Sequence, residues 1–146
     1  MAAKTNYFEN LIIDHLFRAQ ALSLPAAWHF ALFTSAPNEA GGGTEVTGGS
    51  YARVAVTRSL ANFAGTQAAG STTVSTGTNG TTSNNTAITY PAPTANWGTV
   101  VAIGVFDAAT NGNLCFYGNL ATSRIISNGD AAPLFPISSF TYQEDN

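Results

Sequence analysis

Residues 99–120, TVVAIGVFDAATNGNLCFYGNL, contain two strand-like segments joined by a short polar turn. The β-branched run Thr99–Phe106 is typical of a central strand. Asp107–Gly112 predicts a hairpin connection, because its Asn111-Gly112 pair tolerates the positive φ angles that tight turns need. Leu114–Leu120 then predicts the returning strand. We therefore expect an antiparallel hairpin at the centre of the fold.

Further segments of strand composition lie on both sides of this hairpin. They are Ala27–Phe33, Ser50–Arg58, Ala87–Tyr90, Ser123–Ser127 and Leu134–Tyr142, and a polar tail is expected over Gln143–Asn146.

Residues 6–22 predict the one helix, because apolar residues recur there at i, i+3 and i+4 and Leu24-Pro25 follows them. One helix followed by about seven short strands predicts a mainly β protein. We expect a small antiparallel β-sandwich or flattened barrel, with a single domain over residues 1–146 and its β-rich part over residues 27–142.

The chain is poor in charge, and this excludes several classes of function. Of its 146 residues, 9% are charged, against about 25% in ordinary domains, and the net charge is −3. A nucleic-acid surface needs clustered Lys and Arg, so we expect no nucleic-acid partner. One cysteine excludes a disulfide framework, and no His and Cys spacing suggests a metal or other cofactor. A chain with so little charge is expected to function against a partner surface.

The N-terminal segment lacks the uninterrupted apolar stretch of a signal peptide, because Glu9, Asp14 and Arg18 break it. No apolar run in the sequence is long enough to span a bilayer. We therefore expect synthesis in the cytoplasm and no membrane partner.

Residues 65–86, GTQAAGSTTVSTGTNGTTSNNT, are of low complexity and carry no charge. Such a segment buries too little apolar surface to offset its ordering entropy, so we expect a long loop or arm that is disordered in isolation and held by a neighbouring subunit. The candidate interface residues are the polar side chains of this segment together with one aromatic and one basic residue: Thr72, Thr73, Thr78, Asn79, Thr81, Thr82, Asn84, Asn85, Trp97 and Arg53.

Trp97 follows a proline-rich stretch, where a rigid aromatic could anchor a partner, although packing in the core is the favoured interpretation. Basic residues are few. We expect Arg53, Arg58 and Arg124 each to have a specific carboxylate partner, within the chain or across an interface.

No catalytic constellation is evident in the sequence. His15 and His29 are interpreted as packed histidines and Cys115 as an inert buried thiol. A glycosidase pair could come only from distant carboxylates such as Glu45 and Asp107, and Asp107 is better explained as the first residue of its turn. Oxygen atoms of Asp107, Asn111 and Asn113 lack the acidic density of a calcium loop. We therefore expect a protein that is not an enzyme.

Five segments, read in order, resemble a family of small virion proteins of tailed bacteriophages. They are Asn6–Asn10 (NYFEN), Trp28–Pro37 (WHFALFTSAP), Gly43–Arg53 (GTEVTGGSYAR), Asn96–Val100 (NWGTV) and Ile103–Leu114 (IGVFDAATNGNL). Proteins of this family are commonly labelled phage tail fibre or virion structural proteins. The resemblance covers nearly the whole chain except residues 65–86, which look like an insertion, and it supplies no catalytic residues.

The resemblance implies a structural component of the virion, made in the bacterial host. Long receptor-reaching fibres are repetitive, whereas this chain shows neither repeats nor heptads. We therefore expect a capsid decoration (cement) protein that clamps neighbouring capsid subunits, with a tail fibre or tail-associated protein as the alternative. Its expected partners are itself, as a trimer, and other virion proteins such as the major capsid protein. A carbohydrate-binding module for host attachment, built around Trp97, is a further alternative.

Overall fold

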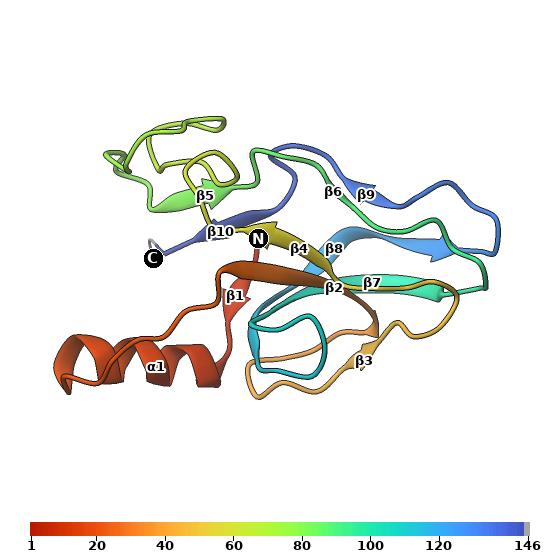
Figure 1. The fold of residues 1–146 in the computed structure, drawn as a ribbon, viewed down its shortest axis with the longest axis horizontal. Helices are drawn as coiled ribbons and strands as arrows, with labels where there is room; N and C mark the ends of the chain where they lie inside the picture. The colour runs from red at the N-terminus through yellow and green to blue at the C-terminus, as the bar shows by residue number, and fades with distance from the viewer. Residues whose placement is uncertain (145–146) are drawn as a thin grey trace.

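The computed structural model describes residues 1–144 and shows one helix and ten strands (Figure 1). In chain order these are β1 (Ala3–Lys4), α1 (Asn6–Phe17), β2 (Ala27–Ser35), β3 (Thr44–Glu45), β4 (Val54–Thr57), β5 (Thr81–Ser83), β6 (Ile88–Thr89), β7 (Gly98–Phe106), β8 (Leu114–Ile126), β9 (Leu134–Phe135) and β10 (Thr141–Gln143).

The large sheet has the strand order β1-β8-β7-β2-β3, and β4 pairs with β2 beside it. All of its pairings are antiparallel. The predicted hairpin is confirmed as β7–β8, in which Val105 lies opposite Phe116. Asn111 and Gly112 in its turn have φ angles of 53° and 72°, which is the left-handed conformation that this dipeptide favours. The hairpin thus lies at the centre of the sheet, as expected.

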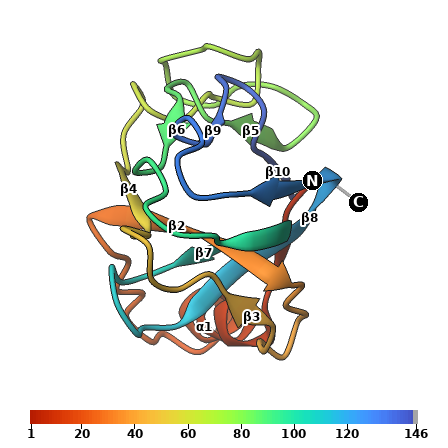
Figure 2. The ribbon, with the colours of Figure 1, turned by 90° about the vertical axis from the view of Figure 1, so that its right-hand side faces the viewer.

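A second layer faces the large sheet and consists of the pairs β5–β10 and β6–β9 with their connecting loops (Figure 2). The N-terminus links the layers, because the Ala2 amide donates to the Thr141 carbonyl at 2.9 Å while β1 pairs with β8. The layers do not close into a barrel. The structure is therefore a mainly antiparallel β-sandwich, and of the two predicted forms the sandwich is the one observed.

The two faces of the large sheet carry different apolar clusters, because side chains alternate along each strand. On β2, Phe30 and Leu32 belong to the main core between the layers. Ala31 and Phe33 belong to a small cluster with Ala102 on the opposite face. The continuous apolar sequence of β2 thus reflects a strand covered on both faces.

α1 lies at one end of the molecule and is shorter than the predicted helix over residues 6–22 (Figure 1). Thr5 is its N-cap and accepts a hydrogen bond from the Phe8 amide. The helix ends at Phe17 because the amides of Arg18 and Gln20 both donate to the Asp14 carbonyl. Ala19 follows with a φ of 55°, a left-handed conformation that terminates helices.

Other predicted boundaries also differ from the structure. The sequence predicts separate strands over Leu114–Leu120 and Ser123–Ser127, but one strand, β8, runs from Leu114 to Ile126 and accommodates the extra residues in a bulge opposite β7. Only Val54–Thr57 of the segment Ser50–Arg58 is a strand. Leu134–Tyr142 contributes to β9 and β10, which pair with different partners.

The expected polar tail is wrong for its first residue, Gln143. Gln143 is the last residue of β10, and the Glu144 carboxylate forms an ion pair with the Lys4 ammonium at 2.6 Å. Main-chain pairing with β5 holds this end of the chain in place, which residue polarity alone does not indicate. Asp145 and Asn146 lie outside the described residues.

Candidate functional site

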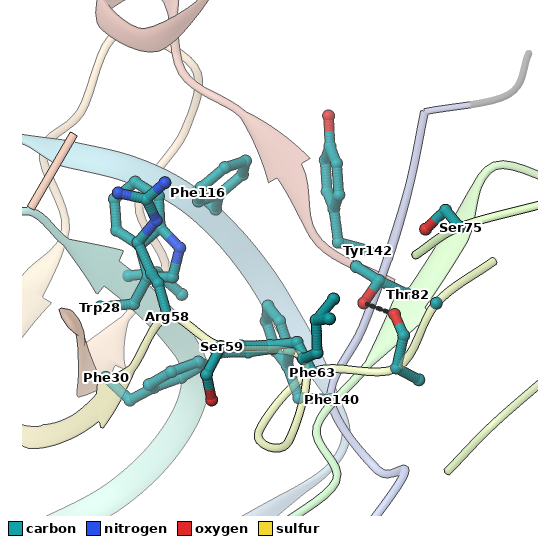
Figure 3. A pocket seen from close by; sticks show the side chains of 14 residues that line it. Trp28, Phe30, Arg58, Ser59, Phe63, Ser75, Thr82, Phe116, Phe140 and Tyr142 are labelled. Carbon is teal, nitrogen blue, oxygen red and sulfur yellow. Dashed lines mark hydrogen bonds between the residues drawn. The ribbon is translucent and has the colours of Figure 1, made fainter. Parts of the chain in front are cut away.

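A cavity of about 480 Å³ opens between the large sheet and the second layer, and six of its fourteen lining residues are aromatic (Figure 3). A volume of this size lies within the ordinary range for binding pockets. The lining residues come from β2, β5, β7, β8, β10, the segment over residues 58–65 that follows β4, and two loop positions: Trp28, Phe30, Arg58, Ser59, Leu60, Phe63, Ala64, Gly65, Ser75, Thr82, Val105, Phe116, Phe140 and Tyr142. We call this cavity the aromatic pocket.

Edge-to-face contacts fix the orientation of these rings. The centroid of Phe116 lies 5.4 Å from that of Trp28 and 4.9 Å from that of Tyr142. On the other wall, Phe30 and Phe140 are 5.0 Å apart and nearly perpendicular. Such arrangements are favourable for aromatic pairs and hold the walls of the pocket in one geometry.

Arg58 is the one cation in the lining of the aromatic pocket. Its guanidinium carbon lies 5.9 Å from the centroid of the Trp28 ring, and its Nη1 donates to the Pro25 carbonyl at 2.8 Å. It forms no ion pair with any residue from 1 to 144. The pocket therefore combines an apolar wall with an uncompensated positive charge.

The GTEVTGGSYAR segment forms a half-buried polar cluster elsewhere in the molecule. Arg53 donates to both carboxylate oxygens of Glu45, through Nε at 2.8 Å and Nη2 at 2.7 Å. The Tyr51 hydroxyl donates to the same carboxylate at 3.0 Å and accepts the Leu32 amide. Burial is the main reason that the pKa of Tyr51 is raised. Because these donors and acceptors pair with one another, the cluster stabilises the fold. We call Glu45, Tyr51 and Arg53 together the Arg53 brace.

Arg53 also connects this brace to the β7–β8 turn. Its Nη1 donates to the carbonyls of Ala108 and Asn111, and its guanidinium carbon lies 3.5 Å from the centroid of the Phe106 ring. The predicted carboxylate partner is thus confirmed for Arg53, within the chain. For Arg58 and Arg124 the described residues supply none, so a carboxylate partner across an interface stays a prediction.

The segment 65–86 is not the disordered loop that its composition predicts. The Gln67 amide group donates to the hydroxyls of Ser71 and Thr73 at 2.5 and 2.7 Å, and its oxygen accepts the Thr76 amide. Several hydroxyls of the segment thus bond its own side chains and backbone, and a neighbouring subunit that holds it stays a prediction. Its last residues are not a loop either, because Thr81–Ser83 form β5 against β10.

The candidate interface residues occupy three different environments. Thr72, Thr73, Thr78 and Asn79 are exposed, whereas Thr81, Thr82 and Asn85 are half-buried. An interface through these residues remains a prediction.

Asn84 and Trp97 lie inside the molecule. The Asn84 amide group donates to the carbonyls of Thr86 and Pro136 and accepts the Phe140 amide. Trp97 is 5% exposed, and its indole N–H donates to the Gly49 carbonyl at 3.0 Å. Neither side chain is available to a partner on this surface, and the exposed ring on which the carbohydrate-binding alternative relied is absent at Trp97.

The residues considered for catalysis each have a structural explanation. His15 bonds the Gln20 carbonyl through Nδ1, and burial together with the charge of Arg53 lowers the pKa of His29. Burial raises the pKa of the Cys115 thiol to about 12. Asp107 uses both carboxylate oxygens to hold Asn113, as the interpretation of Asp107 as a turn residue requires. Within residues 1–144, no three His, Cys, Asp or Glu side chains come together as a metal site.

The aromatic pocket could not be identified in the sequence. Trp28, Phe116 and Tyr142 come from strands that are distant along the chain, and each reads there as an ordinary core residue. The one indication of the pocket in the sequence is Arg58, a rare charged residue directly before the charge-free stretch that begins at Ser59.

Across the described part of the chain, no helix has the length and apolar character needed to cross a membrane.

Comparison with known proteins gives one informative result. No curated protein matches the sequence significantly. The family model described as "Podophage GP4 fiber I protein gp80" matches residues 3–143, which is nearly the whole chain and includes the aromatic pocket and the Arg53 brace. The resemblance to tailed-phage virion proteins of the tail fibre type is therefore confirmed, and the chain belongs to the podophage fiber I gp80 family.

Proposed function

We propose that this protein is a non-enzymatic structural subunit of the tail fibre apparatus of a podophage, joined to other virion chains through its exposed apolar side chains. The match of the fiber I family over residues 3–143 is the observation that carries this proposal. The sandwich supports it, because large apolar residues remain exposed on it. They include Ile13, Leu16, Phe17, Leu60, Val74, Leu134 and Ile137.

Exposed apolar side chains in this number favour an assembly subunit over a free monomer. Charge is what ordinarily keeps monomers apart, and 9% charged residues supply little of it. The protein's partners on this proposal are further copies of itself and other virion proteins.

A capsid decoration protein is the second candidate, and the loop over residues 66–80 favours it. This loop presents Thr72, Thr73, Thr78 and Asn79 to solvent in a fixed conformation stabilised by Gln67. A preformed loop loses little conformational entropy on binding, which suits a clamp between neighbouring capsid subunits.

Labelling of intact particles separates the two candidates. Purified virions are decorated with gold-labelled antibodies against this chain, and the copies per particle are measured by quantitative mass spectrometry. Gold at the tail with a small copy number is the expected result. Gold over the shell with hundreds of copies would overturn the tail assignment in favour of capsid decoration, and absence from purified particles would overturn both.

A further inference from the structure

α1 carries a second apolar stripe in addition to the face that packs on the sheet. Phe8 points into the core, whereas Ile13, Leu16 and Phe17 are 50%, 64% and 81% exposed. The last two follow Ile13 at i+3 and i+4, so the three side chains are neighbours on one side of the helix. We call them the helix stripe. Their exposure shows that they do not fill the aromatic pocket of their own chain.

A single uncompensated carboxylate accompanies the helix stripe. Glu9 precedes Ile13 by four residues and so lies beside it on the helix surface. Glu9 forms no ion pair with any residue that the structure describes, whereas Asp14 pairs with Arg18 at 2.8 Å. The helix stripe therefore presents apolar area with one negative charge near the start of the helix.

The aromatic pocket presents the opposite combination. Six aromatic rings line it, and Leu60, which also belongs to the lining, is 51% exposed. Arg58 supplies one positive charge without a carboxylate among residues 1–144. The two surfaces thus match in apolar character and are complementary in charge, which are the features that position two proteins in one register.

We propose that the helix stripe of one copy docks against the aromatic pocket of a second copy, with Glu9 of the first facing Arg58 of the second. Both surfaces belong to this chain, and one docking covers three exposed apolar side chains and pairs two isolated charges. The contact joins two different surfaces, so repeating it produces a ring or a linear array of copies. This inference concerns self-association and is independent of whether the protein is located at the tail or the shell.

Charge reversal tests the pairing directly. The purified full chain is studied by sedimentation equilibrium over a wide concentration range at low salt. We expect concentration-dependent association whose dissociation constant rises at least about tenfold in Glu9→Lys and in Arg58→Glu, and returns toward the original value in the double variant. Higher salt is expected to weaken the self-association of the unmodified protein, because salt screens exposed charges.

Phe17→Ser tests the apolar part of the contact, and Ile125→Ser is the matched control. Ile125 is 75% exposed on β8 and belongs neither to the helix stripe nor to the aromatic pocket. We expect Phe17→Ser to raise the dissociation constant at least about tenfold and Ile125→Ser to leave it unchanged. Circular dichroism checks that each variant is folded. If Arg58→Glu does not fold, the effect of Glu9→Lys on the dissociation constant still tests the charge pairing.

Three results would overturn the proposal. One is a monomer at every concentration; another is an equal loss in Ile125→Ser. The third is a shift of the indole NMR signal of Trp28 on addition of a saccharide, which would identify the aromatic pocket as a ligand site.

Discussion

Arg53 donates two parallel hydrogen bonds to Glu45, from Nε to Oε1 at 2.8 Å and from Nη2 to Oε2 at 2.7 Å. Its remaining nitrogen, Nη1, donates to two carbonyls of the β7–β8 turn. This pair joins β3 to the central hairpin from the side of the sheet opposite the main core. The arginine side chain is 8% exposed and the glutamate 23% exposed, so solvent screens the interaction only weakly.

Arg53→Ala is expected to be strongly destabilising. It leaves the Glu45 carboxylate without its cation and two turn carbonyls without their donor, so the free energy of unfolding should fall by about 3 kcal/mol. Urea unfolding followed by circular dichroism measures this. Arg18→Ala is the control, because the exposed Arg18–Asp14 pair should contribute less than about 0.5 kcal/mol. Equal effects of the two substitutions would contradict the role of the brace.

Arg53→Lys should recover only part of the lost stability. A lysine keeps the positive charge but cannot reproduce the fork that holds both oxygens of Glu45 and the carbonyls of Ala108 and Asn111. We expect its free energy of unfolding to lie between those of the unmodified protein and Arg53→Ala, in the same urea experiment. Full recovery would show that charge alone suffices.

Asn84→Ala should destabilise the second layer. The fully buried side chain donates to the carbonyls of Thr86 and Pro136 and accepts the Phe140 amide. Alanine therefore removes the partner of the buried Phe140 amide and of the Thr86 carbonyl, whereas the Pro136 carbonyl still accepts from Ser139. A loss of about 2–4 kcal/mol is expected, with Asn79→Ala, at an exposed loop position, as the neutral control. A neutral Asn84→Ala would show that water replaces these bonds at little cost.

Within the low-complexity segment 65–86, we expect only residues 67–78 to be dispensable for folding. Replacing residues 67–78 with a short Gly-Ser linker keeps β5 and Asn84, and should change the free energy of unfolding by about 1 kcal/mol or less. Deleting residues 65–86 removes the strand that pairs with β10 and should prevent cooperative unfolding. A deletion of residues 65–86 that folds as well as the linker variant would contradict this assignment.

Cys115 should be almost unreactive in the native protein. The thiol is 1% exposed, and burial raises its pKa to about 12, so the reactive thiolate is scarce at mildly alkaline pH. Dithionitrobenzoate should react slowly with the native chain and rapidly in urea. Fast labelling without denaturant would indicate that β8 opens locally.

Much of the fold could be predicted from local patterns. The β-branched run of β7 and the Asn111-Gly112 turn identified the central hairpin, because turn chemistry and alternation depend on residues close in sequence. Boundaries that depend on distant pairing were predicted poorly. β5 lies in a Thr-rich segment with no strand signal, and it is a strand because β10 supplies its hydrogen bonds.

The residues of the candidate site also divide into those that could be predicted from the sequence and those that depend on tertiary contacts. Arg53 was singled out correctly as a residue with a specific carboxylate, since so few charges occur in the sequence. For Trp97 the favoured interpretation, packing in the core, is confirmed, whereas Asn84 as an interface candidate is wrong, because its side chain is fully buried. Aromatic and amide side chains occur at surfaces and in cores alike, and only burial distinguishes the two.

The sequence by itself determined the class of the fold, the central hairpin, the family and the shortage of charge, because each depends on composition or on short local patterns. Only the tertiary structure decided which polar residues are buried and which aromatic rings from β2, β8 and β10 meet around one pocket. It also left Glu9 and Arg58 without partners among the described residues. The physical reason is that burial and pairing depend on contacts between residues far apart along the chain, and these exist only once the layers have packed.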